Sequence, residues 1–126
     1  MNNNELLKIK EKALEEHIPI IMDDTLETIK KYIANHKLNS ILEIGTAVGY
    51  SAICFSQFLA ENGQIDTIER EAERVKEAKE NIKKAEVEKY INIYEGDAVE
   101  ILPKLNNKYD MIFIDAAKGK YPFFLK

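Results

Sequence analysis

The sequence has no tryptophan, three prolines, five glycines and a single cysteine, Cys54. One cysteine excludes an intrachain disulfide, and its place in an apolar run predicts a buried, inert thiol. No stretch approaches the roughly 18 apolar residues of a membrane span. The polar, charged start of the chain also lacks the apolar segment of a signal peptide. We therefore expect a cytoplasmic protein with no membrane partner.

A strong excess of charge of one sign is also absent. The 18 basic and 22 acidic side chains give a net charge of −4. This balance argues against a surface coated with nucleic-acid-binding charge, although it leaves room for a local basic patch. The 126 residues are 45% hydrophobic and 32% charged, which suits one folded domain.

Residues 1–39 are expected to form a helical segment. Apolar residues recur with helical spacing over 4–17, and the residue before Pro19 is disfavoured in a helix. A second helix is expected to begin near Asp24, because Asp24 and Glu27 have the spacing of a capping box. A polar connection then leads into the rest of the chain.

From residue 40 onward, short apolar strands alternate with helices. The expected strands are 40–45, 64–69, 90–94 and 109–115, and the expected helices are 50–61, 71–86 and 98–105. This alternation predicts an α/β fold, a doubly wound and mostly parallel sheet with helices on both faces. Such sheets bind ligands at the carboxyl ends of their strands, so the residues that follow each strand are the candidates for chemistry.

Glycines follow the first strand. Gly45 allows a tight turn and a close approach of a ligand, while Gly49 and Ser51 open the next helix. The alternative is a purely structural turn. A nicotinamide-binding G-x-G-x-x-G loop would need a third glycine near Ala52, which is absent, so an oxidoreductase is disfavoured. Glu43 lies inside the strand, and a purely structural Glu43 would need an ion pair or a main-chain hydrogen bond.

Carboxylates follow the other three strands. Glu69 lies 24 residues after Gly45, where dinucleotide folds hold ribose hydroxyls, and a solvated surface position is the alternative. Asp97 would cap the next helix, contact a ligand, or do both. Asp115 ends an apolar strand and would suit a hard cation or an ammonium group. Carboxylates near four strand ends on one edge indicate a ligand site more strongly than any one of them does.

A family resemblance rests on five stretches within residues 17–121: HIPIIMDD, ILEIGTAVGYSA, IDTIER, GDAVEILPKL and YDMIFIDAAKGKY. The chain resembles the metal-dependent O-methyltransferases that use S-adenosylmethionine, which include the caffeoyl-CoA and catechol enzymes. It looks most similar to bacterial members that methylate 5-hydroxyuridine in tRNA. The resemblance implies a Rossmann-like class I methyltransferase fold with strand order 3-2-1-4. It also implies a cofactor-binding α/β domain over 40–126, after the helical segment 1–39.

The same resemblance assigns roles to single residues. It implies that Glu43 and Gly45 line the methionine part of the cofactor and that Ser51 lies beside its carboxylate. Glu69 would bind the ribose hydroxyls, and Asp97 and Ala98 would frame the adenine. Ile21 or Met22 would close over the cofactor. Asp115 would face the cofactor's amino group and bind Mg²⁺ or another divalent cation. Lys118 would act as the general base. The cation would lower the pKa of the acceptor hydroxyl and orient it for methyl transfer.

The resemblance also implies parts that the sequence does not contain. Members of the family carry a further Asp-Asn pair of metal ligands and more strands at one edge of the sheet. We therefore expect a chain that is truncated relative to the family, with the apolar strand 109–115 at an edge. A second copy, giving a homodimer, or a separate chain would cover that edge.

Two functions follow as hypotheses. The first is an O-methyltransferase whose acceptor is a hydroxylated molecule, either catechol-like or 5-hydroxyuridine in tRNA. The second is a non-catalytic fragment that binds S-adenosylmethionine. The tRNA acceptor rests on the resemblance alone, because the helical lysines are also explained as a solvated surface.

Overall fold

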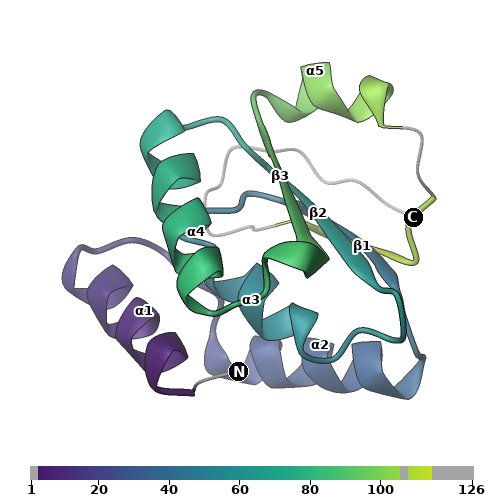
Figure 1. Cartoon of the computed structure of the whole chain (residues 1–126), viewed down its shortest axis with the longest axis horizontal. Coiled ribbons are helices and arrows are strands. Elements are labelled where there is room, and N and C mark those ends of the chain that lie inside the picture. The colour runs from purple at the N-terminus through teal and green to yellow at the C-terminus, as the bar shows by residue number, and fades with distance from the viewer. Residues whose placement is uncertain (1–2, 106–107, 115–126) are drawn as a thin grey trace.

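The structure, a computed structural model, describes residues 3–105 and 108–114 (Figure 1). Its helices are α1 (Asn3–Glu15), α2 (Asp23–Asn35), α3 (Tyr50–Ser56), α4 (Ala72–Lys84) and α5 (Ala98–Ile101), with 3₁₀ turns η1 (Glu88–Tyr90) and η2 (Leu102–Lys104). Its strands are β1 (Ser40–Ile44), β2 (Gln64–Glu69), β3 (Ile91–Glu95) and β4 (Met111–Ile114). The predicted alternation of strands and helices is confirmed. Among these helices, none has the length and apolar character needed to cross a membrane.

The four strands form one parallel sheet in the order β3-β2-β1-β4 (Figure 1). β1 lies between β2 and β4, so that Ile44 pairs with Ile68 on one side and with Ile114 on the other. Parallel strands place their carboxyl ends at the same edge. The predicted α/β fold and the predicted strand order 3-2-1-4 are therefore confirmed.

The sheet separates two apolar clusters. Side chains alternate between the faces of a strand, so Ile41 belongs to the larger cluster and Leu42 to the smaller one. Helices α1 to α4 contribute to the larger cluster, with Ile9 and Ile33 as examples, whereas Ala98 of α5 belongs to the smaller. Helices thus lie on both faces, as the doubly wound prediction requires (Figure 1). The domain boundary at residue 39 stays a prediction.

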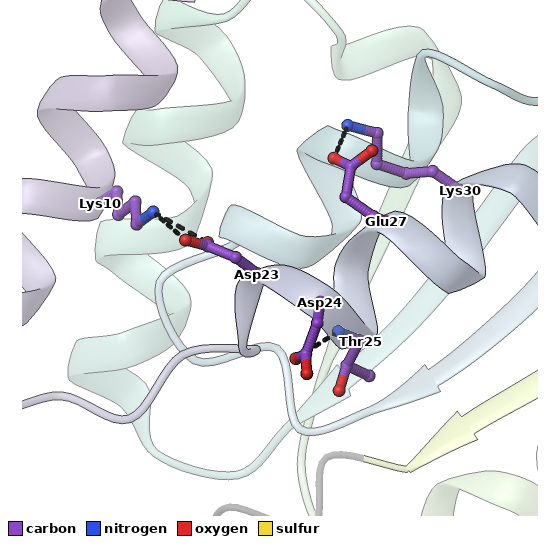
Figure 2. Close-up of polar contacts among 6 residues, drawn as sticks. All are labelled: Lys10, Asp23, Asp24, Thr25, Glu27 and Lys30. Carbon is purple, nitrogen blue, oxygen red and sulfur yellow. Dashed lines mark hydrogen bonds and ion pairs between the residues drawn. The ribbon is translucent and has the colours of Figure 1, made fainter.

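Helix α2 begins differently from the prediction. Its N-cap is Met22, which makes no side-chain capping bond. Asp24 lies inside the first turn and accepts the main-chain N–H of Thr25 at 2.8 Å, so the predicted capping box is wrong. Asp23 instead accepts hydrogen bonds of 2.8 and 3.1 Å from Nζ of Lys10 in α1 (Figure 2). This carboxylate complements the helix dipole and ties α1 to α2.

The predicted helix over 50–61 ends early, at Ser56. Beyond it, the N–H of Ala60 donates to the main-chain oxygen of Leu38 at 2.8 Å. This bond turns the chain toward the residues before β1, so the helix cannot continue. The other predicted elements differ from the observed ones by a few residues at their ends.

Polar contacts hold the start of β4 against β1 and β2. The N–H of Asp110 donates to the main-chain oxygen of Ser40 at 2.7 Å. The Asp110 carboxylate accepts the N–H groups of Asn39 and Ser40 at 3.0 and 3.3 Å. The hydroxyl of Tyr109 donates to Oδ2 of Asp66 at 2.7 Å. These bonds fix the register of β4 against β1.

Removing the Tyr109 hydroxyl is expected to destabilise this part of the sheet. Asp66 is buried, so in Tyr109→Phe its carboxylate loses a donor that water cannot freely replace. We expect the free energy of unfolding, measured in urea, to fall by about 1–2 kcal/mol. The control Tyr32→Phe makes the same change on an exposed ring and should stay within about 0.5 kcal/mol of the wild type. Equal losses in the two variants would contradict the role given to Tyr109.

Candidate functional site

The turns that follow β1, β2 and β3 meet at the carboxyl edge of the sheet. Gly45 follows β1, and its N–H donates to the main-chain oxygen of Ile68 near the end of β2 at 2.9 Å. Gly96 follows β3, and its N–H donates to the main-chain oxygen of Glu69 at 2.8 Å. The structure thus brings together three of the strand ends that the sequence marks as candidates for chemistry.

The turn after β1 has an unusual backbone. In this segment, 45–49, called the glycine turn below, φ is positive at Gly45 (100°), Ala47 (50°) and Gly49 (88°). A left-handed alanine is strained, and such strain occurs most often where a site requires the shape. A Cβ at Gly49 would lie 3.3 Å from Cβ of Ala78 in α4. The positive φ favours glycine here, and the close approach of α4 leaves little room for a larger side chain.

Glu43 is fully buried on β1, beneath the glycine turn. Its Oε1 accepts the hydroxyl of Thr67 at 2.7 Å, and its Oε2 accepts the hydroxyl of Ser51. The hydroxyls of Thr67 and Thr46 are 2.6 Å apart. The sequence suggested an ion pair or a main-chain amide for a structural Glu43, and the structure adds two hydroxyl partners, from β2 and α3. Such bonds offset the cost of burying a carboxylate.

Glu69 is 2% exposed, so the alternative of a solvated surface position is wrong. Its Oε1 accepts the N–H of Ala47 at 2.9 Å, and its Oε2 accepts the N–H of Glu71 at 3.1 Å. One carboxylate therefore joins the glycine turn to the turn after β2. Each carboxylate oxygen can accept more than one hydrogen bond, so these contacts are compatible with ribose hydroxyls, and that role stays a prediction.

Asp97 is the N-cap of α5. Its Oδ1 accepts the N–H of Val99 at 2.9 Å, which confirms the capping role. Ala98, the next residue, is buried in the smaller apolar cluster. The capping bond does not exclude a contact with a ligand. The contact of Asp97 and Ala98 with adenine stays a prediction.

A small pocket lies between the segment before α2 and the glycine turn. It is lined by Pro19, Ile20, Ile21, Thr46, Ala47, Val48, Tyr50 and Ser51. Met22 is 69% exposed and does not line it. Of the two residues predicted to close over a cofactor, the structure brings Ile21 to the pocket and leaves Met22 outside.

A wider groove of about 890 Å³ lies away from this edge. It is lined by residues that follow α3 and α4, namely Ser56, Gln57, Leu59, Ala60, Glu61, Asn62, Lys84, Ala85, Glu86, Val87, Lys89 and Tyr90. These segments lead into β2 and β3, so the groove lies toward the amino ends of the strands. Of the predicted site residues within 3–105, none lines it.

Cys54 is buried in α3, as predicted. Burial raises the pKa of its thiol to about 11. The thiol is therefore protonated at neutral pH, and the inert role is supported because the thiolate is the reactive form.

Two predicted site residues, Asp115 and Lys118, lie outside the described residues. Within 3–105 and 108–114, no group of three or more His, Cys, Asp and Glu side chains could hold a metal ion. The roles of Asp115 as metal ligand and Lys118 as base stay predictions.

Two polar residues of the site were not predicted from the sequence. Thr67 faces Glu43 in the parallel register of β1 and β2 and donates to it. Asn81 of α4 donates through Nδ2 to the main-chain oxygen of Val48 at 2.8 Å and so supports the glycine turn. A polar residue in a buried strand needs a partner, which could have drawn attention to Thr67. No local signal marks Asn81.

The chain is similar to known proteins in sequence and fold. Residues 4–126 match the family described as O-methyltransferase. A catechol O-methyltransferase of Niastella koreensis is 40% identical over 86 residues, which cover 65% of this chain and 39% of that protein.

Two solved structures extend the match. A putative caffeoyl-CoA O-methyltransferase from Staphylococcus aureus is 39% identical, with a TM-score of 0.83 over 90% of this chain and 54% of that chain. The O-methyltransferase TomG from Streptomyces achromogenes, solved in complex with SAM, is 28% identical, with a TM-score of 0.81 over 92% of this chain and 55% of that one. The matched region thus spans 39% to 55% of these three proteins.

Proposed function

This chain belongs to the O-methyltransferase family, and we propose that it binds S-adenosylmethionine at the carboxyl edge of its sheet. We further propose that the protein transfers the cofactor's methyl group to a hydroxyl oxygen. The observation that carries the proposal is Glu69, whose buried carboxylate joins the glycine turn to the turn after β2. TomG, which has a similar fold, was solved with SAM.

The proposed cofactor runs along the edge from β1 to β3. Glu43, Gly45 and Ser51 would line its methionine part, Glu69 its ribose, and Asp97 and Ala98 its adenine, with Ile21 closing over it. The strained glycine turn and the pocket beside Ile21 support this placement. Met22 is exposed and does not line this pocket, and its closing role stays a prediction.

Methyl transfer requires an ionised acceptor oxygen in line with the sulfonium methyl carbon. The oxygen attacks that carbon while the carbon–sulfur bond breaks, and the electron pair of the broken bond goes to sulfur, which becomes a neutral thioether. The hydroxyl proton is proposed to pass to the amine of Lys118, which must be neutral to accept it. A divalent cation at Asp115, when bound, would lower the pKa of the hydroxyl and orient it.

A catechol-like acceptor is favoured over 5-hydroxyuridine in tRNA. Two related proteins bear the names catechol and caffeoyl-CoA O-methyltransferase. Lys10 and Lys30 form ion pairs of 2.8 Å with Asp23 and Glu27 (Figure 2), so these two lysines are explained without RNA. A homodimeric state and a cytoplasmic location complete the proposal as predictions.

Calorimetric titration of the chain with S-adenosylmethionine, S-adenosylhomocysteine and NAD tests the proposal. We expect saturable binding of the first two and none of NAD. Methyl transfer to catechol and to an oligonucleotide containing 5-hydroxyuridine is then measured with and without Mg²⁺. Binding without transfer would give the chain the alternative function, cofactor binding alone. No binding of S-adenosylmethionine, or tighter binding of NAD, would overturn the proposal.

A further inference from the structure

We propose that Thr67 is a positioning residue of the cofactor site. Its hydroxyl donates a hydrogen bond to the carboxylate of Glu43 and lies within hydrogen-bond distance of the hydroxyl of Thr46, which lines the pocket beside Ile21. Through these contacts Thr67 fixes the positions of the Glu43 carboxylate and the Ser51 hydroxyl at the cofactor site. This inference rests on the proposed function, because it assigns Thr67 a role in the same site.

Four polar side chains form one continuous network, in the order Ser51, Glu43, Thr67, Thr46. The two ends of this network, Ser51 and Thr46, line the pocket beside Ile21. Its two middle members, Glu43 and Thr67, are both fully buried. Both ends of the network therefore lie at the pocket, and its middle lies in the sheet. Thr67 does not line the pocket and contacts it only through Glu43 and Thr46.

The direction of each hydrogen bond follows from counting protons. The hydroxyls of Ser51 and Thr67 both donate to carboxylate oxygens of Glu43. A hydroxyl carries one proton, and Thr67 has then used its own. The contact of 2.6 Å with Thr46 must therefore be a donation from Thr46 to Thr67. Removing the Thr67 hydroxyl would take from Glu43 the bond on its Oε1 and from Thr46 the oxygen to which it donates.

Thr67 and Ser51 differ in what they can do when a cofactor arrives. Ser51 is only partly buried and lies at the pocket, so a rotation of its side chain can turn its proton toward a ligand carboxylate. That proton would then be withdrawn from Glu43. Thr67 is fully buried between strands and keeps its bond. The orientation of the Glu43 carboxylate thus depends on Thr67 in both states.

The test compares side chains of nearly the same shape. Thr67→Val exchanges the hydroxyl for a methyl group and is expected to weaken binding of S-adenosylmethionine about tenfold, because the Glu43 carboxylate is no longer held where the cofactor meets it. Thr67→Ser keeps the hydroxyl and should bind within about threefold of the wild type. Affinity is measured by calorimetry, and stability is measured by thermal unfolding of the same samples.

A matched control separates positioning from stability. Ile65 is fully buried on the same face of β2, two residues earlier and away from the carboxyl edge. Ile65→Val shortens a core side chain without touching a hydroxyl, so it should lower the melting temperature and leave the affinity unchanged. A merely structural Thr67 would give Thr67→Val and Ile65→Val the same pattern.

The outcomes distinguish the two proposals. Wild-type chain that fails to bind S-adenosylmethionine would defeat the proposed function, and this inference with it. Wild-type binding that Thr67→Val retains in full would overturn this inference alone, as would a Thr67→Ser variant as weak as Thr67→Val. If Thr67→Val does not fold, Thr67→Cys replaces it with a weak S–H donor. A loss close to tenfold would again support the inference, and an unchanged affinity would overturn it.

Discussion

Glu69→Gln is expected to lower the affinity for S-adenosylmethionine at least tenfold. The Glu69 carboxylate accepts the N–H groups of Ala47 and Glu71, one on each oxygen. Glutamine offers one oxygen, and its –NH₂ group can only donate. One of the two main-chain N–H groups would then face another donor in a buried site. That lost bond destabilises the folded chain with or without cofactor, whereas losing the proposed bond to ribose, at roughly 1.5–3 kcal/mol, lowers the affinity tenfold or more.

The control for this variant is Glu95→Gln. Glu95 pairs with Glu69 in the register of β2 and β3, so the same chemical change is made at the same level of the sheet. Glu95 is exposed, and its neutralisation should leave the affinity within about twofold. Both affinities are measured by calorimetry after circular dichroism has confirmed the fold. A Glu69→Gln chain that binds as tightly as Glu95→Gln would reject the role of Glu69.

The sheet could be predicted from the sequence because its strands are short apolar runs between helices, and a buried parallel strand requires such a run. The helix ends could not. The end of α3 depends on a bond between Ala60 and Leu38, and the start of α2 involves an ion pair between Asp23 and Lys10. Both are contacts between segments that local periodicity does not connect.

The position of the site was easier to predict than its interior. Glu43 and Glu69 stand at strand ends, and parallel topology alone brings those ends together. Their burial and partners depend on which face each side chain takes and on the strand register, which places Thr67 against Glu43. The choice between Ile21 and Met22 depends on how one turn is oriented before α2. The sequence pattern of this segment does not show which of the two side chains faces the pocket.

The site also concentrates several costs to stability. Two carboxylates are buried there, and Ala47 has a left-handed backbone. A chain selected for stability alone would have apolar side chains at such positions, because burying a charge is costly even when it is hydrogen-bonded. Departures of this kind are expected at functional sites. Asp66 is also buried, and other non-glycine residues also have positive φ, so the support for the proposed binding role comes from two buried carboxylates and a strained turn that contact one another.

Gly49→Val is expected to lower the free energy of unfolding by about 3 kcal/mol. The positive φ of 88° costs a residue with a Cβ roughly 1–2 kcal/mol. A Cβ would also lie 3.3 Å from Cβ and 3.4 Å from Cα of Ala78, and the branched methyl groups of valine add overpacking of roughly 1–3 kcal/mol. Urea denaturation measures the loss. Binding of S-adenosylmethionine should weaken as well, because the glycine turn must shift away from α4.

A double-mutant cycle separates the two causes. Gly49→Ala keeps the backbone strain with a smaller steric conflict, and Ala78→Gly removes the methyl group that it meets, at a helix cost of about 1 kcal/mol. If crowding against α4 contributes, the double variant will be more stable than the sum of the single losses predicts. Strict additivity would instead assign the whole cost to the positive φ. Glycine would then be required at position 49 for its conformation alone, and the fit to α4 would leave room for alanine.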